Sequence, residues 1–354
     1  MRFDFADLLM DVLERRASDL HVTSGQHPMI RVRGRLVAMD DYPKLMPVDT
    51  REVVYSILTN DQRQRLETDH QLDFAYSVPG HARFRVNAYL QRSSLAAAFR
   101  LIPATIVPID DLGLPPIVHE LCTKPRGLVL VTGPTGSGKS TSLASMIDEI
   151  NETREDHILT IEDPIEFLHS HKKCMVNQRE LGHDATSFAA ALKAALRQDP
   201  DVILVGEMRD LETIQLALTA AETGHLVLGT LHTGNAPRTL DRVLDVFPTD
   251  QREQIRIMVS ESLRGILSQQ LVPRADGNGR VLALELLVNT PAVSNCIREG
   301  KTFMLPGVMQ TGKNVGMITM DESLRQLYVK GIISKDETLF RSDDKGQMKA
   351  FFES

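Results

Sequence analysis

The sequence predicts an α/β protein with two domains, an N-terminal α+β domain followed by a larger domain with a mainly parallel sheet. Three observations lead to this prediction. Segments with alternating apolar and polar residues occur up to Ile102, a proline-rich stretch follows, and beyond Gly127 short apolar runs alternate with helical patterns. Alternation is typical of half-buried strands, whereas continuous apolar runs suit strands covered on both faces.

The first domain is expected to span residues 1–102. Apolar residues at helical spacing, such as Leu8, Leu9 and Val12, predict an amphipathic helix near its start. Gly25 and Pro28 provide a turn between the first two alternating segments. In order, the expected elements are a helix at 5–16, strands at 19–24 and 29–39, a helical segment at 49–67, and strands at 72–78, 82–92 and 94–103.

A linker and a second domain are expected after this. Residues 103–116 hold four prolines in fourteen positions, which suits an extended, stiff connector. The second domain would then cover residues 117–354, with buried strands joined by helical crossovers. Its expected strands lie at 127–133, 157–163, 201–207 and 225–232, and the tail from about Ser260 is expected to be helical apart from one strand at 280–288.

Composition limits the classes of function. Apolar residues make up 42% and charged residues 25% of the chain, as in an ordinary globular protein. A formal charge of -7 gives no bulk reason to bind nucleic acid. The three cysteines show no metal-binding spacing, which fits a reducing cytosol. Neither a signal peptide nor a membrane span is expected, because no uninterrupted apolar run approaches ~18 residues.

The strongest motif is the run GPTGSGKST between a buried strand and a helix. It matches the phosphate-binding loop pattern, in which glycines let backbone N–H groups face the phosphates of ATP. Lys139 is expected to reach the β- and γ-phosphates, and the Ser140 hydroxyl to ligate Mg²⁺. The predicted nucleotide-binding residues are Gly133, Pro134, Thr135, Gly136, Ser137, Gly138, Lys139, Ser140 and Thr141.

Acidic residues follow two of the expected strands, at the edge where a parallel sheet places catalytic groups. One strand ends in Glu162 and Asp163, with Glu166 soon after; another ends in Gly206 and Glu207. Glu162 is the preferred candidate for the base that activates water, and Glu207 for the group that supports Mg²⁺ and its waters. The reverse assignment is the alternative.

Two histidines flank the apolar run LVLGTL, and their seven-residue spacing suits the two ends of one strand. His232 would then lie at the carboxyl end, beside the γ-phosphate, and is a catalytic candidate. His225 would lie at the opposite end, where a packing or simple hydrogen-bonding role is equally compatible with the sequence.

The motifs together resemble those of the secretion ATPase superfamily: GPTGSGKST as Walker A, ILTIEDPIEF as the Asp box, LRQDPDVILVGEMRD as Walker B, and TAAETGHLVLGTLHTGNA as the His box. ASDLH, RFRVNAYLQR and NTPAVSNCIREGKT narrow the resemblance to PilT-like retraction ATPases of type IV pili. In the atypical Walker B motif of this superfamily, a glycine is usual where Gly206 stands.

This resemblance covers nearly the whole chain and implies a PAS-like N-terminal domain, a RecA-like ATPase domain and a homohexameric ring at the cytoplasmic base of the pilus machine. Its activity would be ATP hydrolysis that powers pilus retraction and twitching motility. The implied partners are an inner-membrane platform protein and a PilU-like paralogue. It also implies that Arg85 and Arg100 reach the γ-phosphate, although the alternation of ARFRVN is equally typical of a solvated strand face, and Arg83 stays open.

Other interpretations remain open at this point. The chain lacks the four-cysteine zinc element of the related extension ATPases, while a PilU-like accessory ATPase is a closer alternative. Ser294 stands where the retraction family has the first arginine of Ala-Ile-Arg-Asn-Leu-Ile-Arg-Glu. In this segment Val288, Val293, Cys296 and Ile297 fall near helical spacing, with Arg298 and Glu299 facing outward. A nucleic-acid translocase or a weakly hydrolysing assembly subunit are the alternatives from other classes.

Overall fold

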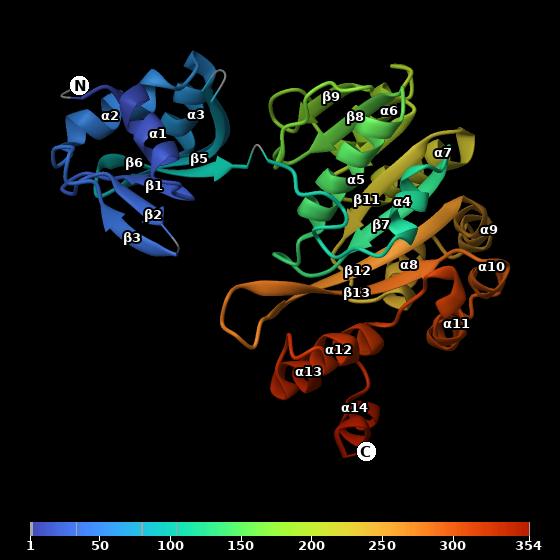
Figure 1. Ribbon diagram of the computed structural model, residues 1–354. Coiled ribbons are helices and arrows are strands. Elements are labelled where there is room, and N and C mark those ends of the chain that lie inside the picture. The colour runs from blue at the N-terminus through green and yellow to red at the C-terminus, as the bar shows by residue number, and fades with distance from the viewer. Residues whose placement is uncertain (1–2, 33, 79–80, 104, 354) are drawn as a thin grey trace. The chain divides into compact units, whose positions relative to one another are not determined.

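The computed structural model describes residues 3–32, 34–78, 81–103 and 105–353. The chain divides into two compact units, Met1–Thr105 and Ile106–Ser354, each with its own sheet and core. An N-terminal antiparallel sheet and a mainly parallel second sheet confirm the predicted fold class (Figure 1).

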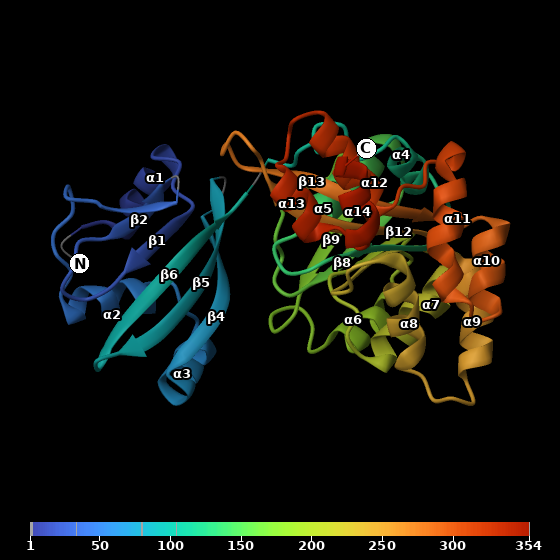
Figure 2. The ribbon, with the colours of Figure 1, turned by 90° about the horizontal axis from the view of Figure 1, so that it is seen from below.

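The first unit is a six-stranded antiparallel sheet with the order β3-β2-β1-β6-β5-β4. Its core joins apolar residues of α1, α2 and α3, such as Leu8, Val53 and Leu66, to sheet residues such as Phe84 and Phe99. Figure 2 shows these helices and the strands of the sheet. The elements are α1 (Phe5–Glu14), β1 (Asp19–Val22), β2 (Met29–Val32), β3 (Arg35–Ala38), α2 (Pro47–Ser56), α3 (Asn60–Asp69), β4 (Gln71–Val78), β5 (Ala82–Gln91) and β6 (Ser94–Ile102).

Two predicted segments of this unit are divided in the structure. The expected strand at 29–39 is the hairpin β2–β3. The expected helical segment at 49–67 is two helices, because Thr59 starts a new one: its hydroxyl accepts the Gln62 N–H at 3.3 Å, and the Gln62 side chain accepts the Thr59 N–H at 3.0 Å. Such a reciprocal cap is a strong helix-start signal, and periodicity alone does not detect it.

The second unit contains a seven-stranded sheet with the order β13-β12-β7-β11-β10-β8-β9. All neighbouring strands run parallel except the β12–β13 hairpin. The strands are β7 (Gly127–Thr132), β8 (His157–Glu162), β9 (Met175–Glu180), β10 (Val202–Val205), β11 (Leu226–Leu231), β12 (Leu263–Pro273) and β13 (Arg280–Val288).

Helices cover both faces of this sheet. One core contains residues of α4 and α5, together with Ile109 and Leu114 from the proline-rich stretch. The other contains residues of α6 to α11. The helices are α4 (Ile117–Cys122), α5 (Lys139–Thr153), α6 (Phe188–Ala195), α7 (Leu211–Thr223), α8 (Ala236–Asp245), α9 (Arg252–Ser262), α10 (Pro291–Arg298), α11 (Leu305–Thr311), α12 (Met320–Val329), α13 (Lys335–Arg341) and α14 (Lys345–Glu353).

The tail is less helical than the sequence predicts, because β12 follows α9 directly. This strand carries buried polar residues, Ser268 and Gln269, which interrupt its apolar pattern. They are accommodated by hydrogen bonds: Thr132 Oγ1 donates to Ser268 Oγ at 2.9 Å, and Gln269 Nε2 to Ser142 Oγ at 2.7 Å. The expectation of one further strand beyond Ser260 was therefore wrong; a hairpin extends the parallel sheet.

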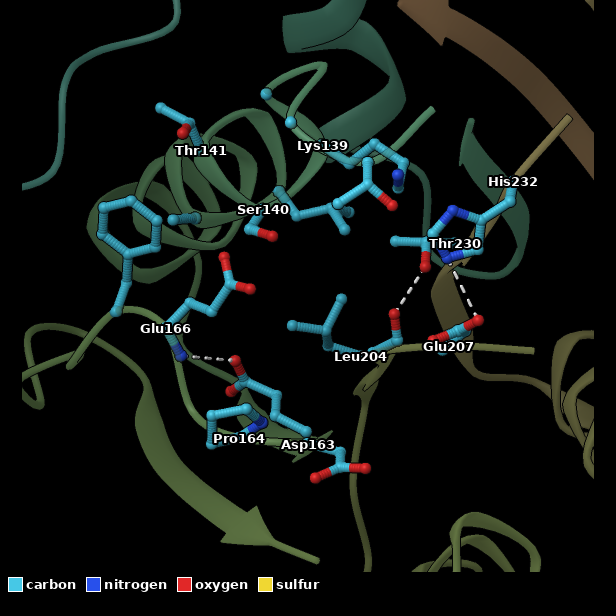
Figure 3. A pocket seen from close by; sticks show the side chains of 18 of the residues that line it. Lys139, Ser140, Thr141, Asp163, Pro164, Glu166, Leu204, Glu207, Thr230 and His232 are labelled. Atoms are coloured by element: carbon cyan, nitrogen blue, oxygen red, sulfur yellow. Dashed lines mark hydrogen bonds and ion pairs between the residues drawn. The ribbon is translucent and has the colours of Figure 1, made fainter. Parts of the chain in front are cut away.

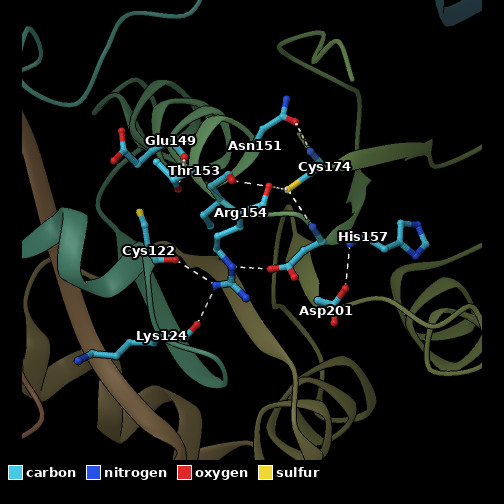
Figure 4. A network of polar contacts seen from close by, with 11 residues as sticks. Cys122, Lys124, Glu149, Asn151, Thr153, Arg154, His157, Cys174 and Asp201 are labelled. Carbon is cyan, nitrogen blue, oxygen red and sulfur yellow. Dashed lines mark hydrogen bonds and ion pairs between the residues drawn. The ribbon is translucent and has the colours of Figure 1, made fainter. Parts of the chain in front are cut away.

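A polar network fixes the far end of α5, the helix that begins at the nucleotide loop (Figure 4). Arg154 Nη1 donates to the carbonyls of Cys122 at 3.1 Å and Lys124 at 2.9 Å, and the Cys174 thiol donates to the Arg154 carbonyl at 3.1 Å. Cys122, Cys174 and Cys296 are free and buried, and burial raises the pKa of the Cys122 thiol to about 12. A thiol with so high a pKa is unreactive at neutral pH.

Candidate functional site

The glycine-rich loop wraps the end of β7 and leads into α5, which begins at Lys139. Gly136 and Gly138 have positive φ angles of 78° and 91°, which glycine adopts without steric cost. A Cβ atom at Gly133 would lie 2.4 Å from the Gln269 carbonyl oxygen. The loop therefore needs glycine at this position because β12 lies directly beneath it.

Lys139 lies over this loop. Its Nζ donates to the carbonyls of Gly133 at 2.8 Å and Pro134 at 3.2 Å. Burial lowers its pKa from the ordinary lysine value, while Glu207 and Glu166 act in the opposite direction. An ammonium group here faces the N-terminal end of α5, where backbone N–H groups and the helix dipole also favour an anion.

The loop opens into a cleft of about 430 Å³. Figure 3 shows that Lys139 and Ser140 come from the start of α5, whereas Glu207 and His232 come from the opposite side. The sequence-predicted residues in its lining are Thr135, Gly136, Gly138, Lys139, Ser140, Thr141, Glu162, Glu207 and His232. Of the remaining loop residues, Gly133 and Ser137 are buried and Pro134 is exposed.

Glu162, at the end of β8, is held by several donors. Its Oε1 accepts from Thr160 Oγ1 at 2.6 Å and Gln178 Nε2 at 3.2 Å, and its Oε2 accepts from the Glu166 N–H at 3.4 Å. Burial raises the pKa of Glu162, outweighing the hydrogen bonds that favour its charged form. The result is a fixed carboxylate with increased basicity.

Glu207 faces the cleft from the loop after β10. Its Oε1 lies 3.1 Å from Nε2 of His232, and it also pairs with Arg209. The residue before it leaves little room for a side chain, since a Cβ at Gly206 would lie 3.0 Å from the Ile161 carbonyl oxygen and 3.2 Å from the Glu162 Cα. The close approach of β8 and β10 explains why the acid follows a glycine.

The two histidines occupy opposite ends of β11. His225 precedes the strand, and its Nδ1 lies 3.0 Å from the carbonyl oxygen of Ala220 at the end of α7. This contact gives His225 a local structural role. His232 follows the strand directly and lines the cleft beside Glu207.

Several cleft residues were not assigned a role from the sequence. Glu166 lies on the loop after β8, and Figure 3 shows its carboxylate pointing toward Ser140. Gln178 orients Glu162 from β9, a strand whose sequence MVNQRE lacks an apolar run. Leu271 and Arg280 reach the cleft from the β12–β13 hairpin. Of these four residues, only Glu166 has a sequence signal, because it is an acid that closely follows the segment ILTIE. The positions of Gln178, Leu271 and Arg280 depend on unpredicted strands or on tertiary pairing.

The Ser140 hydroxyl and the carboxylates of Glu166 and Glu207 share one cleft. Hydroxyl, carboxylate and phosphate oxygens are the ligands that Mg²⁺ prefers. The donor set is therefore compatible with a magnesium–nucleotide complex.

Arg85 and Arg100 lie in the first unit, directly opposite each other on β5 and β6. Arg100 is also opposite Asp19 of β1, whose Oδ1 lies 2.9 Å from the Arg100 Nε. The Asp19 side chain is only 9% exposed, and it also approaches Arg31 Nε at 3.8 Å. Like charges on facing strands repel, so Asp19 compensates part of the cost of this exposed arginine pair.

The segment after β13 forms α10 as the sequence indicates. Thr290 caps the helix by accepting the Val293 N–H, and Val293, Cys296 and Ile297 are buried. Arg298 and Glu299 are exposed. Val288, however, ends β13 instead of lying on a preceding helical turn.

Ser294 connects α10 to its surroundings. Its hydroxyl donates to the Ser260 carbonyl at 2.9 Å and lies 3.0 Å from Oδ1 of Asn289. An arginine at this position could not keep these short contacts, because its guanidinium lies several bonds farther from the backbone.

Comparisons with known proteins identify relatives of this chain. The family described as type II/IV secretion system protein matches residues 3–342. The type IV pilus retraction ATPase PilT of Pseudomonas aeruginosa is 51% identical over 94% of this chain and 96% of its own length. The type IV pilus ATPase PilU of the same organism is 42% identical over 98% and 90%, respectively.

A solved structure gives the same result for the fold. The crystal structure of the pilus retraction motor PilT with bound ADP has a TM-score of 0.93 and 50% identity, and it covers 98% of this chain and 99% of its own. Within the described ranges, no helix has the length and apolar content that a membrane crossing requires.

Proposed function

Because the chain belongs to the type II/IV secretion system protein family, we propose that it is an ATP-hydrolysing motor that powers type IV pilus retraction. The observation that carries this proposal is the cleft that joins the loop of Lys139 and Ser140 to Glu162, Glu207 and His232. Greater identity to PilT than to PilU favours the retraction motor over the accessory role.

The proposed chemistry assigns one task to each group. Lys139 and the loop N–H groups neutralise the phosphates of ATP, and Ser140 contributes to binding Mg²⁺. Glu162, held by Thr160 and Gln178, accepts the proton of the attacking water. Glu207 supports the metal and its waters, and His232 faces the γ-phosphate. The alternative exchanges the roles of the two acids.

The proposed assembly is a homohexameric ring that acts on an inner-membrane platform protein at the cytoplasmic face of the pilus machine, with a PilU-like paralogue as a second proposed partner. Hydrolysis would change the domain arrangement, and the ring would use this change to remove pilin subunits, which produces twitching motility. Nucleic acid is not a proposed partner, in line with the charge of -7.

Two measurements test the proposal. A strain deleted for the gene should extend pili without retracting them, and the wild-type gene should restore retraction. The purified protein should hydrolyse ATP only with Mg²⁺, and DNA should not stimulate it. Normal retraction without the gene would contradict the proposal. DNA-stimulated turnover that salt suppresses would also contradict it and would favour a translocase. Negligible Mg-ATP turnover would favour an assembly subunit.

Arg100→Ala should lower kcat by about 10²-fold and change ATP affinity much less, because negative charge on the γ-phosphate oxygens grows in the transition state. Arg85→Ala should act in the same direction. Arg35→Ala, which removes an exposed arginine from β3 of the same sheet, is the matched control. Steady-state ATPase rates and nucleotide titrations check this, and equal losses in both quantities would indicate ordinary ground-state binding.

We further propose that α10 passes motion to the pilus machine. Replacing Arg298 and Glu299 together by alanine should abolish retraction and leave ATPase turnover within about twofold. Both residues are exposed, and the 2.7 Å pair between Glu299 and Lys301 lies at the surface, so stability should change little. Retraction and ATPase rates are measured on the same variant; normal retraction, or a parallel fall in both, would remove the case for a separate transmission element.

Ser294→Arg tests whether serine, in place of the family's arginine, affects the transmission of motion through α10. Retraction should change while turnover persists, because the substitution removes the bonds from Ser294 to Ser260 and Asn289. Unchanged retraction would mean that the serine is a neutral replacement.

A further inference from the structure

A buried carboxylate outside the nucleotide chemistry lies in the middle of β13. Glu285 is only 5% exposed. It stands opposite Ser268 of β12, and Ser268 stands opposite Thr132, the last residue of β7 before the nucleotide loop. Burying a charged group carries a large cost unless it is hydrogen-bonded, so this position calls for a physical reason.

Glu285 accepts hydrogen bonds from the starts of two helices. Its Oε1 accepts the Ala236 N–H, the first residue of α8, at 2.7 Å, and the carboxylate also accepts the backbone N–H of Met320, the first residue of α12. Only three residues separate Ala236 from His232 of the cleft. One carboxylate therefore contacts both the histidine loop and the C-terminal helices.

Further polar contacts connect the same two places. The Asn235 side chain caps α8 by accepting the Arg238 N–H at 3.0 Å and also bonds to Asp343. The Asp321 carboxylate of α12 accepts the N–H groups of Asp343 at 2.7 Å and Asp344 at 2.9 Å. The loop between α13 and α14 is thus tied to the start of α8 and to α12.

We propose that Glu285 is a positioning residue that fixes the start of α8, and with it the His232 loop, relative to α12–α14, so that nucleotide binding alters the C-terminal helices through this carboxylate. The inference rests on the proposed ATPase function and extends it to the route by which the cleft communicates.

The raised pKa of Glu285 means that its charged form is costly to keep buried, which supports a functional reason for an acid at this position. Burial raises its pKa to about 7, with Asp343 and Asp321 acting in the same direction and the two N–H donors opposing them. Burial and Asp321 also raise the pKa of neighbouring Asp343, and Arg238 of α8 opposes this shift. The folded-state pKa of Glu285 is therefore higher than the pKa of a glutamate in the unfolded chain. Because of this difference, the free energy of unfolding falls as pH rises from the unfolded-state pKa through about 7. Keeping the carboxylate charged above this pH costs stability, whereas a neutral glutamine would not.

Glu285→Gln is the direct test, since it keeps the shape but removes the charge and one acceptor oxygen. Hydrogen exchange is measured on the full-length wild-type and variant proteins with and without Mg-ATP, in peptides covering residues 133–141, 232–246 and 319–330. ATP should slow exchange in the first peptide of both proteins. In wild type it should also change exchange at 319–330, and this change should be lost in Glu285→Gln. The variant's kcat should fall by about tenfold with its KM nearly unchanged.

Controls separate this idea from its alternatives. Glu212→Gln, an exposed acid in the first turn of α7, should behave as wild type. If Glu285→Gln does not fold, Asn235→Ser provides the second variant, because serine keeps the cap of α8 and removes the amide that reaches Asp343; it should reduce the ATP-dependent change at 319–330.

The coupling is overturned if the ATP-dependent change in hydrogen exchange at 319–330 persists in Glu285→Gln, or in Asn235→Ser where only that variant folds. It is also overturned if ATP protects 133–141 in the wild-type protein and leaves exchange at 319–330 unchanged. Lack of protection at 133–141 in wild type would instead contradict nucleotide binding, and thus the proposed function itself. The pH dependence adds a further readout: the melting temperature of Glu285→Gln relative to wild type should rise between pH 6 and pH 8.

Discussion

Lys139→Ala should reduce ATP hydrolysis to the level of buffer, a loss of at least about 10²-fold, and should abolish retraction. The ammonium group is the cation that α5 presents at the nucleotide loop, where it bonds the Gly133 and Pro134 carbonyls. Without it, the loop would offer the phosphates of ATP its backbone N–H groups but no cationic side chain. Nucleotide titration and a coupled ATPase assay measure the two consequences.

The fold should survive this change, because the apolar residues under the loop belong to β7 and to α5 beyond its first residue. Circular dichroism of Lys139→Ala should match wild type. Lys193→Ala, which removes an exposed lysine from α6, should retain activity and controls for the loss of one positive charge. Normal turnover in Lys139→Ala would contradict the nucleotide-site assignment.

Fold class could be inferred from local patterns because they reflect burial directly. The runs at β7 and β10 are buried at every position, so their apolar character predicts central parallel strands. β9 was missed for the opposite reason: it is an edge strand, and most of its residues are polar. β12 was missed because Ser268 and Gln269 are buried only with their partners from β7 and α5.

The site shows the same division. The loop of Lys139 is encoded in consecutive residues, so its pattern could be recognised without a structure. Gln178 and Thr160, which orient Glu162, depend on the pairing of side chains within β8 and across β8–β9. The family resemblance pointed to Arg85 and Arg100, but their position opposite each other, with Asp19 beside them, follows only from the strand register.

Glu162→Gln should bind ATP normally and lose hydrolysis by ~10²–10⁴-fold, the usual contribution of a positioned base. An amide of the same shape can still accept from Thr160 and Gln178 through its oxygen, whereas its NH2 group would face the Glu166 N–H and lose that 3.4 Å bond. It cannot accept the proton of the attacking water. Burial already raises the pKa of the carboxyl, which makes the wild-type group a better proton acceptor than an exposed glutamate.

Glu207→Gln distinguishes the two acids, because its surroundings differ. Glu207 contacts His232 and Arg209, so the amide should weaken these ion pairs and the support of Mg²⁺. We expect a higher Mg²⁺ requirement and a smaller loss of kcat at saturating metal. Glu222→Gln, an exposed acid near the end of α7, should leave both quantities unchanged. Single-turnover hydrolysis across a Mg²⁺ series decides between the assignments: if Glu207→Gln loses turnover at every metal concentration while Glu162→Gln retains it, Glu207 is the base and Glu162 is the supporting acid.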